Sequence, residues 1–151
     1  MTRAENYVTL EFLSRSSNES FARTAAAGFA AQLDPTLDEL GDIKTAVSEA
    51  VTNAIVHGYP DSLGRITLRM RIYEDHILEL QIRDRGVGIS DVERARQPMY
   101  TTGGEERSGM GFTIMESFMD AMKVTSAPGR GTSVTMRKRI SCRVKHERAR
   151  A

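Results

Sequence analysis

The feature that most constrains this chain's fold is a strand-like run that ends in an acid and two glycines. Apolar residues alternate with polar ones from Leu78 to Ile82, and the next position of the alternation is Asp84. Side chains two residues apart share one face of a strand, so Asp84 is predicted to point into the core. A carboxylate there is costly unless a donor meets it, and Gly86 and Gly88 let the backbone turn sharply and approach a ligand. The run predicts a pocket floor, and the simpler alternative is a strand-ending cap.

Length and composition indicate one globular domain. The chain has 151 residues, of which 40% are hydrophobic and 27% charged, enough for a single core. No apolar run is long enough to cross a bilayer and no signal-peptide pattern is present, so we expect no membrane contact. The single Cys142 excludes an internal disulfide, which suits a reducing cytoplasm.

Charge is distributed unevenly along the chain. Seven basic side chains from Arg137 onward stand against Glu147 alone, so at a net charge of +1 the preceding part is acidic. An acidic body argues against direct DNA binding. Because no aromatic residues interleave these charges, we expect residues 141–151 to be a basic, disordered tail and not a nucleic-acid arm. Residues 1–140 then form the folded domain.

The first part of the chain predicts a strand over residues 7–13 followed by two amphipathic helices. The first helix covers residues 19–33 and is expected to bury four apolar residues spaced four apart: Phe21, Ala25, Phe29 and Leu33. Arg23 lies away from this stripe, as a surface arginine would. Asp34 is the predicted N-cap of the second helix, residues 36–57, which Gly58 ends.

The second helix carries a polar stripe as well as an apolar one. Glu49, Asn53 and His57 are four residues apart and lie away from the apolar stripe. On an ordinary surface helix this arrangement means solvent contact only. Small residues surround Asn53, however, so a neighbouring element could approach closely. His57 has no second histidine or cysteine at metal-ligand spacing.

The second half predicts a hairpin, a long loop, a helix and a second hairpin. Strands over residues 66–72 and 77–84 are joined by a short turn, and strands over 123–126 and 132–138 by a tight one. Between the hairpins, residues 88–107 hold no regular period. A loop of this length in a compact domain is usually functional, so we expect a lid.

The helix after this loop begins with a glycine pair. Gly109 and Gly111 leave backbone N–H groups exposed at a helix N-terminus, where the dipole is positive, and this is a good seat for phosphate oxygens. Arg107 directly before them could add charge-assisted bonds. The simpler alternative is that glycines on either side of Met110 only permit close packing.

The order of these motifs resembles the ATP-binding domain shared by gyrase, heat-shock chaperones, histidine kinases and MutL, the GHKL superfamily. Within it, the segments 49–59, 83–89 and 106–116 are similar to the sporulation anti-sigma-F family of serine-protein kinases. The resemblance covers nearly the whole chain. It implies an α+β fold, a two-layer sandwich whose mixed, mostly antiparallel sheet is covered on one face by helices, known as the Bergerat fold.

The resemblance also implies a site for ATP or ADP with Mg²⁺. Asn53 would hold the Mg²⁺, and Glu49 would be the catalytic base on the attacking hydroxyl. Asp84 would accept a hydrogen bond from the adenine amino group. The implied nucleotide-binding residues are Asn53, Asp84, Gly86, Gly88, Thr102, Arg107, Gly109, Gly111 and Thr132.

By the same resemblance, the chain would be a cytoplasmic protein-serine kinase that phosphorylates a serine of an anti-anti-sigma protein. As an ATP-loaded homodimer it would also bind and inhibit a sporulation sigma factor, for which Arg23 is our candidate contact. Two alternatives stay open: a related stress-response anti-sigma-B kinase, and a nucleotide-gated binding module without kinase activity. A detached histidine-kinase domain is disfavoured, because no acceptor helix precedes residue 7.

Overall fold

The computed structural model describes residues 3–97 and 110–141, and its centre is a five-stranded sheet. The strands are β1 (Asn6–Leu13), β2 (Arg65–Tyr73), β3 (Ile77–Asp84), β4 (Ala121–Ala127) and β5 (Gly131–Arg139). Their spatial order is β1-β2-β3-β5-β4, and each neighbouring pair is antiparallel. A sheet of mixed direction was expected, but no parallel pair occurs among these strands.

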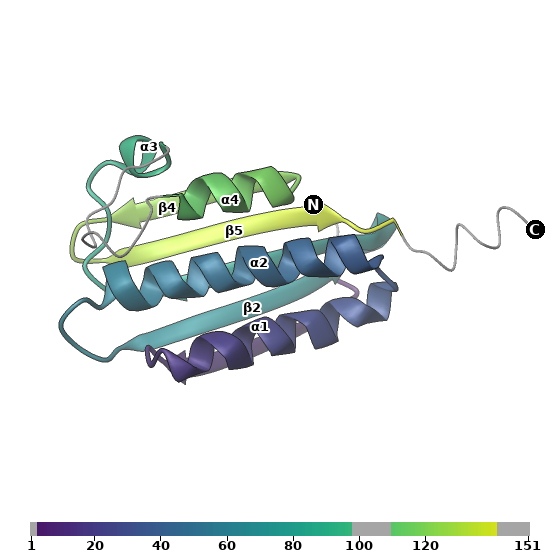
Figure 1. The fold of residues 1–151 in the computed structure, drawn as a ribbon, viewed down its shortest axis with the longest axis horizontal. Helices are drawn as coiled ribbons and strands as arrows, with labels where there is room; N and C mark the ends of the chain where they lie inside the picture. Colours follow the sequence, from purple (N-terminus) through teal and green to yellow (C-terminus); the bar gives the residue numbers. More distant parts are fainter. Residues whose placement is uncertain (1–2, 98–109, 142–151) are drawn as a thin grey trace, which may run out of the picture.

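The helical segments of the described residues are α1 (Ser17–Ala30), η1 (Ala31–Leu33), α2 (Leu37–Asn53), η2 (Ala54–Gly58), η3 (Glu74–His76), α3 (Val92–Ala95) and α4 (Gly111–Phe118). In Figure 1, α1, α2 and α4 lie in front of the strands, on one face of the sheet. This two-layer arrangement confirms the predicted fold class. No helix in the described ranges is both long enough and apolar enough to cross a bilayer.

The core lies between the sheet and these helices. On β2 and β3 every second side chain faces it, and Ile66, Leu68, Leu78, Leu80 and Ile82 are all 2% exposed or less. Burying each such side chain contributes about 1.5–3 kcal/mol. The alternation continues to Asp84, which is 6% exposed, so its predicted inward direction is confirmed.

The buried stripe of α1 differs from the prediction. Ala22, Ala26 and Ala30 are completely buried, whereas Phe21 is 53% exposed. The small alanine side chains let α1 lie close against α2 and the sheet, and the phenylalanine ring is left at the surface. Of the predicted stripe only Leu33 is buried, with 8% of its surface exposed.

The start of α2 was also predicted wrongly. Thr36, not Asp34, is the N-cap: its hydroxyl accepts a hydrogen bond from the Glu39 N–H at 3.1 Å, and the Glu39 carboxylate accepts one from the Thr36 N–H. Asp34 instead takes a left-handed conformation with φ of 49°. The reciprocal pair satisfies two N–H groups at once, which a single cap cannot do.

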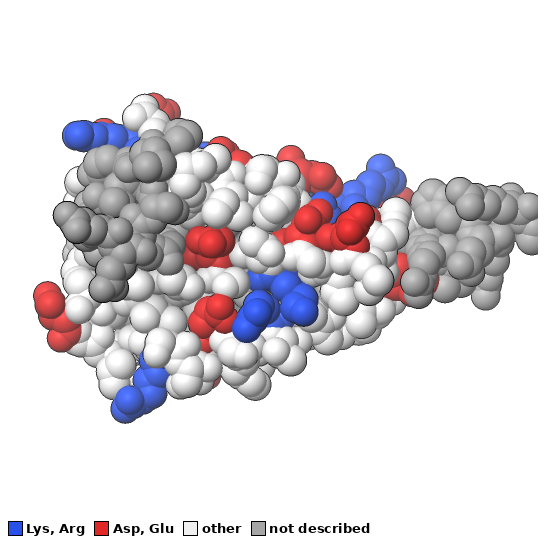
Figure 2. Space-filling model, viewed as in Figure 1, with Lys and Arg blue, Asp and Glu red and all other residues white. Residues whose placement is uncertain are grey.

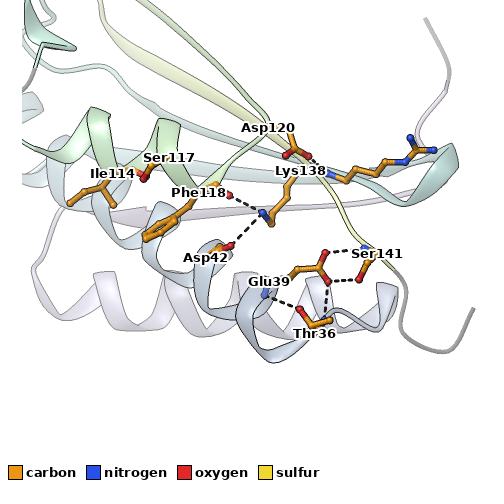
Figure 3. A network of polar contacts seen from close by, with 10 residues as sticks. Thr36, Glu39, Asp42, Ile114, Ser117, Phe118, Asp120, Lys138 and Ser141 are labelled. Atoms are coloured by element: carbon orange, nitrogen blue, oxygen red, sulfur yellow. Dashed lines mark hydrogen bonds and ion pairs between the residues drawn. The ribbon is translucent and has the colours of Figure 1, made fainter. Parts of the chain in front are cut away.

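Polar contacts hold the end of β5 against two helices (Figure 3). The Lys138 ammonium donates to the Phe118 carbonyl at 2.8 Å, at the C-terminus of α4, and lies 3.5 Å from Asp42 on α2. Nearby, the Glu39 carboxylate accepts bonds from the N–H and hydroxyl of Ser141, both at 2.9 Å. A cation at a helix C-terminus is favourable, so Lys138 stabilises α4 from the end opposite Gly111.

Candidate functional site

The floor of the site is the carboxylate of Asp84 at the end of β3. Its Oδ1 accepts a hydrogen bond from the Gly86 N–H at 2.9 Å, and the Thr132 N–H donates to the same carboxylate. Burial raises the pKa of Asp84 above its usual value near 3.8, and these two N–H groups offset the shift only in part. The acid is therefore desolvated and retains capacity to accept a further donor.

One wall is built by an irregular end of the second helix. The predicted helix ends earlier than expected, because residues 54–58 form the π-turn η2, closed by a bond from the Tyr59 N–H to the Ala54 carbonyl at 3.2 Å. This wider turn brings Gly58 against Asp84: a Cβ on Gly58 would lie 3.0 Å from the carboxylate. π-turns of this kind occur often at functional sites.

The backbone at Gly86 and Val87 packs against this wall. The Gly58 carbonyl accepts the Val87 N–H at 2.9 Å, and a Cβ on Gly86 would lie 1.9 Å from that carbonyl oxygen. Gly86 therefore permits the close approach of two backbones, and it does not itself line the cavity. Gly88 does line it, with φ of +77° and no room for a side chain beside Ala127.

The opposite wall is the first turn of α4. A Cβ on Gly111 would lie 3.0 Å from Asn53 Nδ2, 3.1 Å from Asn53 Oδ1 and 3.3 Å from Glu49 Oε2. The absence of a side chain at Gly111 thus allows the α4 N-terminus to rest directly on the polar stripe of α2. The stripe faces a neighbouring element and not open solvent.

A single cavity of about 170 Å³ joins these parts. Its polar and glycine lining includes Asn53, His57, Asp84, Gly88, Ser90, Asp91, Gly111 and Thr132. Apolar residues cover much of the rest: Ala50, Ala54, Ile82, Val87, Ile89, Ala95, Phe112 and Val134. An apolar slot with one buried acceptor at its base and a helix N-terminus at its mouth suits a flat, aromatic, phosphate-bearing ligand.

Five of the predicted site residues line this cavity: Asn53, Asp84, Gly88, Gly111 and Thr132. Glu49 borders it beside Gly111. Arg23 lies elsewhere, on α1, paired with Glu19 at 3.3 Å. The predicted Thr102, Arg107 and Gly109 fall outside the described residues, as does half of the predicted lid, residues 98–107.

Several lining residues were not singled out from the sequence. Ala95 lies in the short helix α3, Asp91 is its N-cap and Ser90 directly precedes the cap. The Asp91 carboxylate accepts the Arg94 N–H at 3.1 Å. The sequence shows no regular period over this segment and no pattern that places a helical turn beside the cavity. His57 was placed in the polar stripe but was not predicted to bind a ligand, and the π-turn that places it on the cavity wall has no sequence signal.

Known proteins are similar to this chain over most of its length. Residues 14–138 match the family described as histidine kinase-like ATPase domain. The chain is 57% identical over 136 residues to the anti-sigma F factor of Caldanaerobacter subterraneus, covering 89% of this chain and 94% of that protein. The chain belongs to the anti-sigma F factor family. The Bacillus subtilis anti-sigma F factor is 55% identical over 139 residues, covering 91% and 94% of the two chains.

Solved structures also share the fold of this chain. A Mycobacterium tuberculosis protein with RsbU and RsbW domains superposes with a TM-score of 0.65 at 18% identity, over 89% of this chain and 32% of that one. The histidine kinase domain of an Erythrobacter litoralis blue-light activated kinase gives 0.57 at 21% identity, over 82% and 61%. The family match and the cavity together imply binding of ATP or ADP.

Proposed function

We propose that this protein is an ATP-dependent protein-serine kinase that also binds a sporulation sigma factor and inhibits it. One observation supports this most strongly: a single cavity connects the buried Asp84 to the first turn of α4, with Asn53 on its wall and Glu49 at its border. Such a cavity can hold adenine at one end and phosphates at the other.

Each residue in this set has a chemical task. The Asp84 carboxylate accepts a hydrogen bond from the adenine amino group, and the N–H groups at the start of α4 bind phosphate oxygens. The Asn53 side-chain oxygen is a suitable ligand for Mg²⁺, which would neutralise charge on the phosphates when bound. No cluster of three or more His, Cys, Asp or Glu side chains suited to a metal occurs in the described residues, so the nucleotide itself would complete the Mg²⁺ ligands.

Glu49 is the proposed general base. A serine hydroxyl of the anti-anti-sigma partner attacks the terminal phosphorus of ATP, a new O–P bond forms, and the bond to the bridging oxygen of ADP breaks. The serine proton passes to the Glu49 carboxylate. Positioning and electrostatic stabilisation account for most of the catalysis in phosphoryl transfer, and both depend here on the contact between α2 and α4.

The proposed partner surface is the helical face seen in Figure 2, where basic and acidic side chains lie interspersed over α1 and α2. The Arg23 side chain is 41% exposed and lies 3.3 Å from Glu19, whose carboxylate also accepts the Ser48 hydroxyl at 2.6 Å. A fixed, half-exposed arginine is well suited to bind a partner's carboxylate. The names of the relatives favour the sporulation sigma factor over the stress-response one. We further propose that the protein acts as a cytoplasmic homodimer.

Phosphotransfer to a candidate anti-anti-sigma protein tests this function. Incubation with labelled ATP and Mg²⁺ should label a serine of that protein. Glu49→Gln should bind ATP normally but lose the transfer, because the amide cannot accept the serine proton. Glu74→Gln, an exposed change in η3, serves as the control and should remain fully active. If Glu49→Gln transfers phosphate at the normal rate, Glu49 is not the base. If the wild type itself transfers no phosphate, the protein is a nucleotide-gated binding module and not a kinase.

Capture of the sigma factor tests the second activity. Arg23→Ala should leave ATP affinity unchanged and weaken capture in a pull-down by roughly tenfold or more, the effect of removing an arginine anchor from an interface. Arg139→Ala, exposed at the far end of β5, is the matched control. Intact capture by Arg23→Ala would rule this surface out.

A further inference from the structure

The face of the sheet opposite the helices carries a second hollow. Its volume is about 130 Å³, and it is lined by Thr9, Glu11, Arg65, Thr67, Arg69, Gln81, Arg83 and Arg85. Successive side chains of a strand point to opposite faces, so Arg83 points away from the face that Asp84 occupies. Arg85, the first residue after β3, lines the same hollow as Arg83. The hollow is therefore separate from the nucleotide cavity and shares no lining residue with it.

Positive charge is concentrated in this hollow. Four of its lining residues are arginines and only Glu11 is acidic. The antiparallel register places Thr67 opposite Arg83 and Arg69 opposite Gln81, so the arginines of β2 and β3 share one small area. Like charges gathered on neighbouring strands destabilise a sheet unless an opposite charge offsets them.

Little of this charge is offset within the described residues. Arg65 lies 3.5 Å from Glu11. Arg69 donates from Nη2 to a neutral amide oxygen at 2.8 Å, and its Nε is buried without a hydrogen bond. Neither Arg83 nor Arg85 forms an ion pair with any residue that the structure describes.

The other acid on this face is already engaged. Glu79 is 7% exposed and its Oε2 is 2.7 Å from both Nε and Nη2 of Arg137. The Arg137 guanidinium also lies over the Tyr73 ring, 5.4 Å from its centre. Glu79 is therefore fixed in a pair of its own, and the hollow keeps its excess of guanidinium groups.

We propose that this hollow binds a phosphate-type dianion, either free phosphate or a phosphoryl group carried on a protein. A phosphate group offers three acceptor oxygens and about two negative charges, which matches the two unpaired guanidinium forks of Arg83 and Arg85. A single carboxylate would offset only half of that charge. A nucleic acid needs a line of cationic contacts, whereas this hollow is small and has Glu11 at its edge.

Thermal unfolding in inorganic phosphate tests the site. The protein is loaded with ADP and Mg²⁺ so that the nucleotide cavity is filled, and phosphate replaces chloride at constant ionic strength. Phosphate should raise the Tm of the wild type by about 2–4 °C. The double variant Arg83→Gln/Arg85→Gln should lose this rise, whereas the control Lys44→Gln/Arg139→Gln, with both changes at exposed sites of equal charge, should keep it. An equal rise in the Arg83→Gln/Arg85→Gln protein, or none in the wild type, would overturn the proposal.

A second measurement distinguishes anion binding from a purely structural role of these arginines, because the expected change in Tm has the opposite direction. Without phosphate and at low ionic strength, Arg83→Gln/Arg85→Gln should unfold at a higher temperature than the wild type, because repulsion among the arginines has been removed. The single variant Arg85→Gln, whose position lies outside β3, should shift the Tm in the same direction by a smaller amount. A lower Tm in both proteins would show that these arginines stabilise the sheet and would contradict the proposal.

The source of the phosphate is found by repeating the titration with a phosphoserine peptide. Protection by the peptide at lower concentrations than inorganic phosphate identifies a protein-borne phosphoryl group as the ligand. Protection by inorganic phosphate alone identifies the free anion. If the unphosphorylated peptide protects as well as the phosphorylated one, binding does not depend on the phosphoryl group, and the assignment of the site to phosphate is wrong.

Discussion

Asp84 shows how one residue can be costly for folding and useful for binding. Its carboxylate lies on the buried face of β3, where desolvation raises the pKa, and two N–H groups compensate only in part. A ligand that donates a hydrogen bond to this carboxylate would stabilise a group that the fold alone leaves under-satisfied. This is the physical reason for the adenine position that we propose.

This cost predicts the pH dependence of stability. A carboxyl whose pKa is raised on folding binds its proton more tightly in the native state, so its contribution to stability falls as pH rises from about 3.8 through the raised value. Without nucleotide, Asp84→Asn should remove this loss. The gain in the free energy of unfolding over wild type should grow as pH increases from 4 to 7 in urea titrations. Asp61→Asn, at an exposed position, should show no such trend, and a parallel pair of profiles for Asp84→Asn and wild type would contradict the desolvation account.

At the scale of elements, the contact between α2 and α4 depends on a glycine. Gly111→Ala would place a methyl group 3.0–3.3 Å from the side chains of Asn53 and Glu49, and these would have to move. Glu49 is the proposed base, and small displacements of a base are expensive, so the proposed phosphotransfer should fall by roughly ten- to hundredfold while the Tm changes little.

Gly28→Ala is the matched control, because it lies on the exposed side of α1 with nothing within 4 Å of the added Cβ. Alanine is the better helix former, so this variant should gain about 0.5–1 kcal/mol of stability and keep full activity. Loss of stability without loss of activity in Gly111→Ala would show that the glycine serves packing only.

For the whole molecule, most features that follow from a strict repeat of apolar residues could be predicted from the sequence. The alternation from Leu78 to Ile82 placed Asp84 correctly, because a register shift of one residue would turn the apolar side chains of the strand from the core face to the outer face of the sheet. The burial of α1 could not be found in this way. Phe21 and Ala22 are both apolar neighbours at suitable helical positions, and only the close packing of α1 on α2 selects the alanine face.

The end of α2 was unpredictable for a different reason. The π-turn at residues 54–58 is stabilised by a contact from a distant part of the chain, the bond from Val87 to the Gly58 carbonyl. Local propensity and periodicity contain no information about such a bond. The cavity wall therefore emerges only when α2 and the turn after β3 are in place together.

The most direct test of the account is a calorimetric titration of ATP with Mg²⁺ into the wild type and Asp84→Asn, with Asp61→Asn as control. The account predicts one ATP per chain for the wild type and Asp61→Asn, and a loss of about 1–3 kcal/mol of binding free energy for Asp84→Asn, the cost of mispairing a buried polar group. Equal affinity in all three proteins would show that the nucleotide does not bind against this carboxylate.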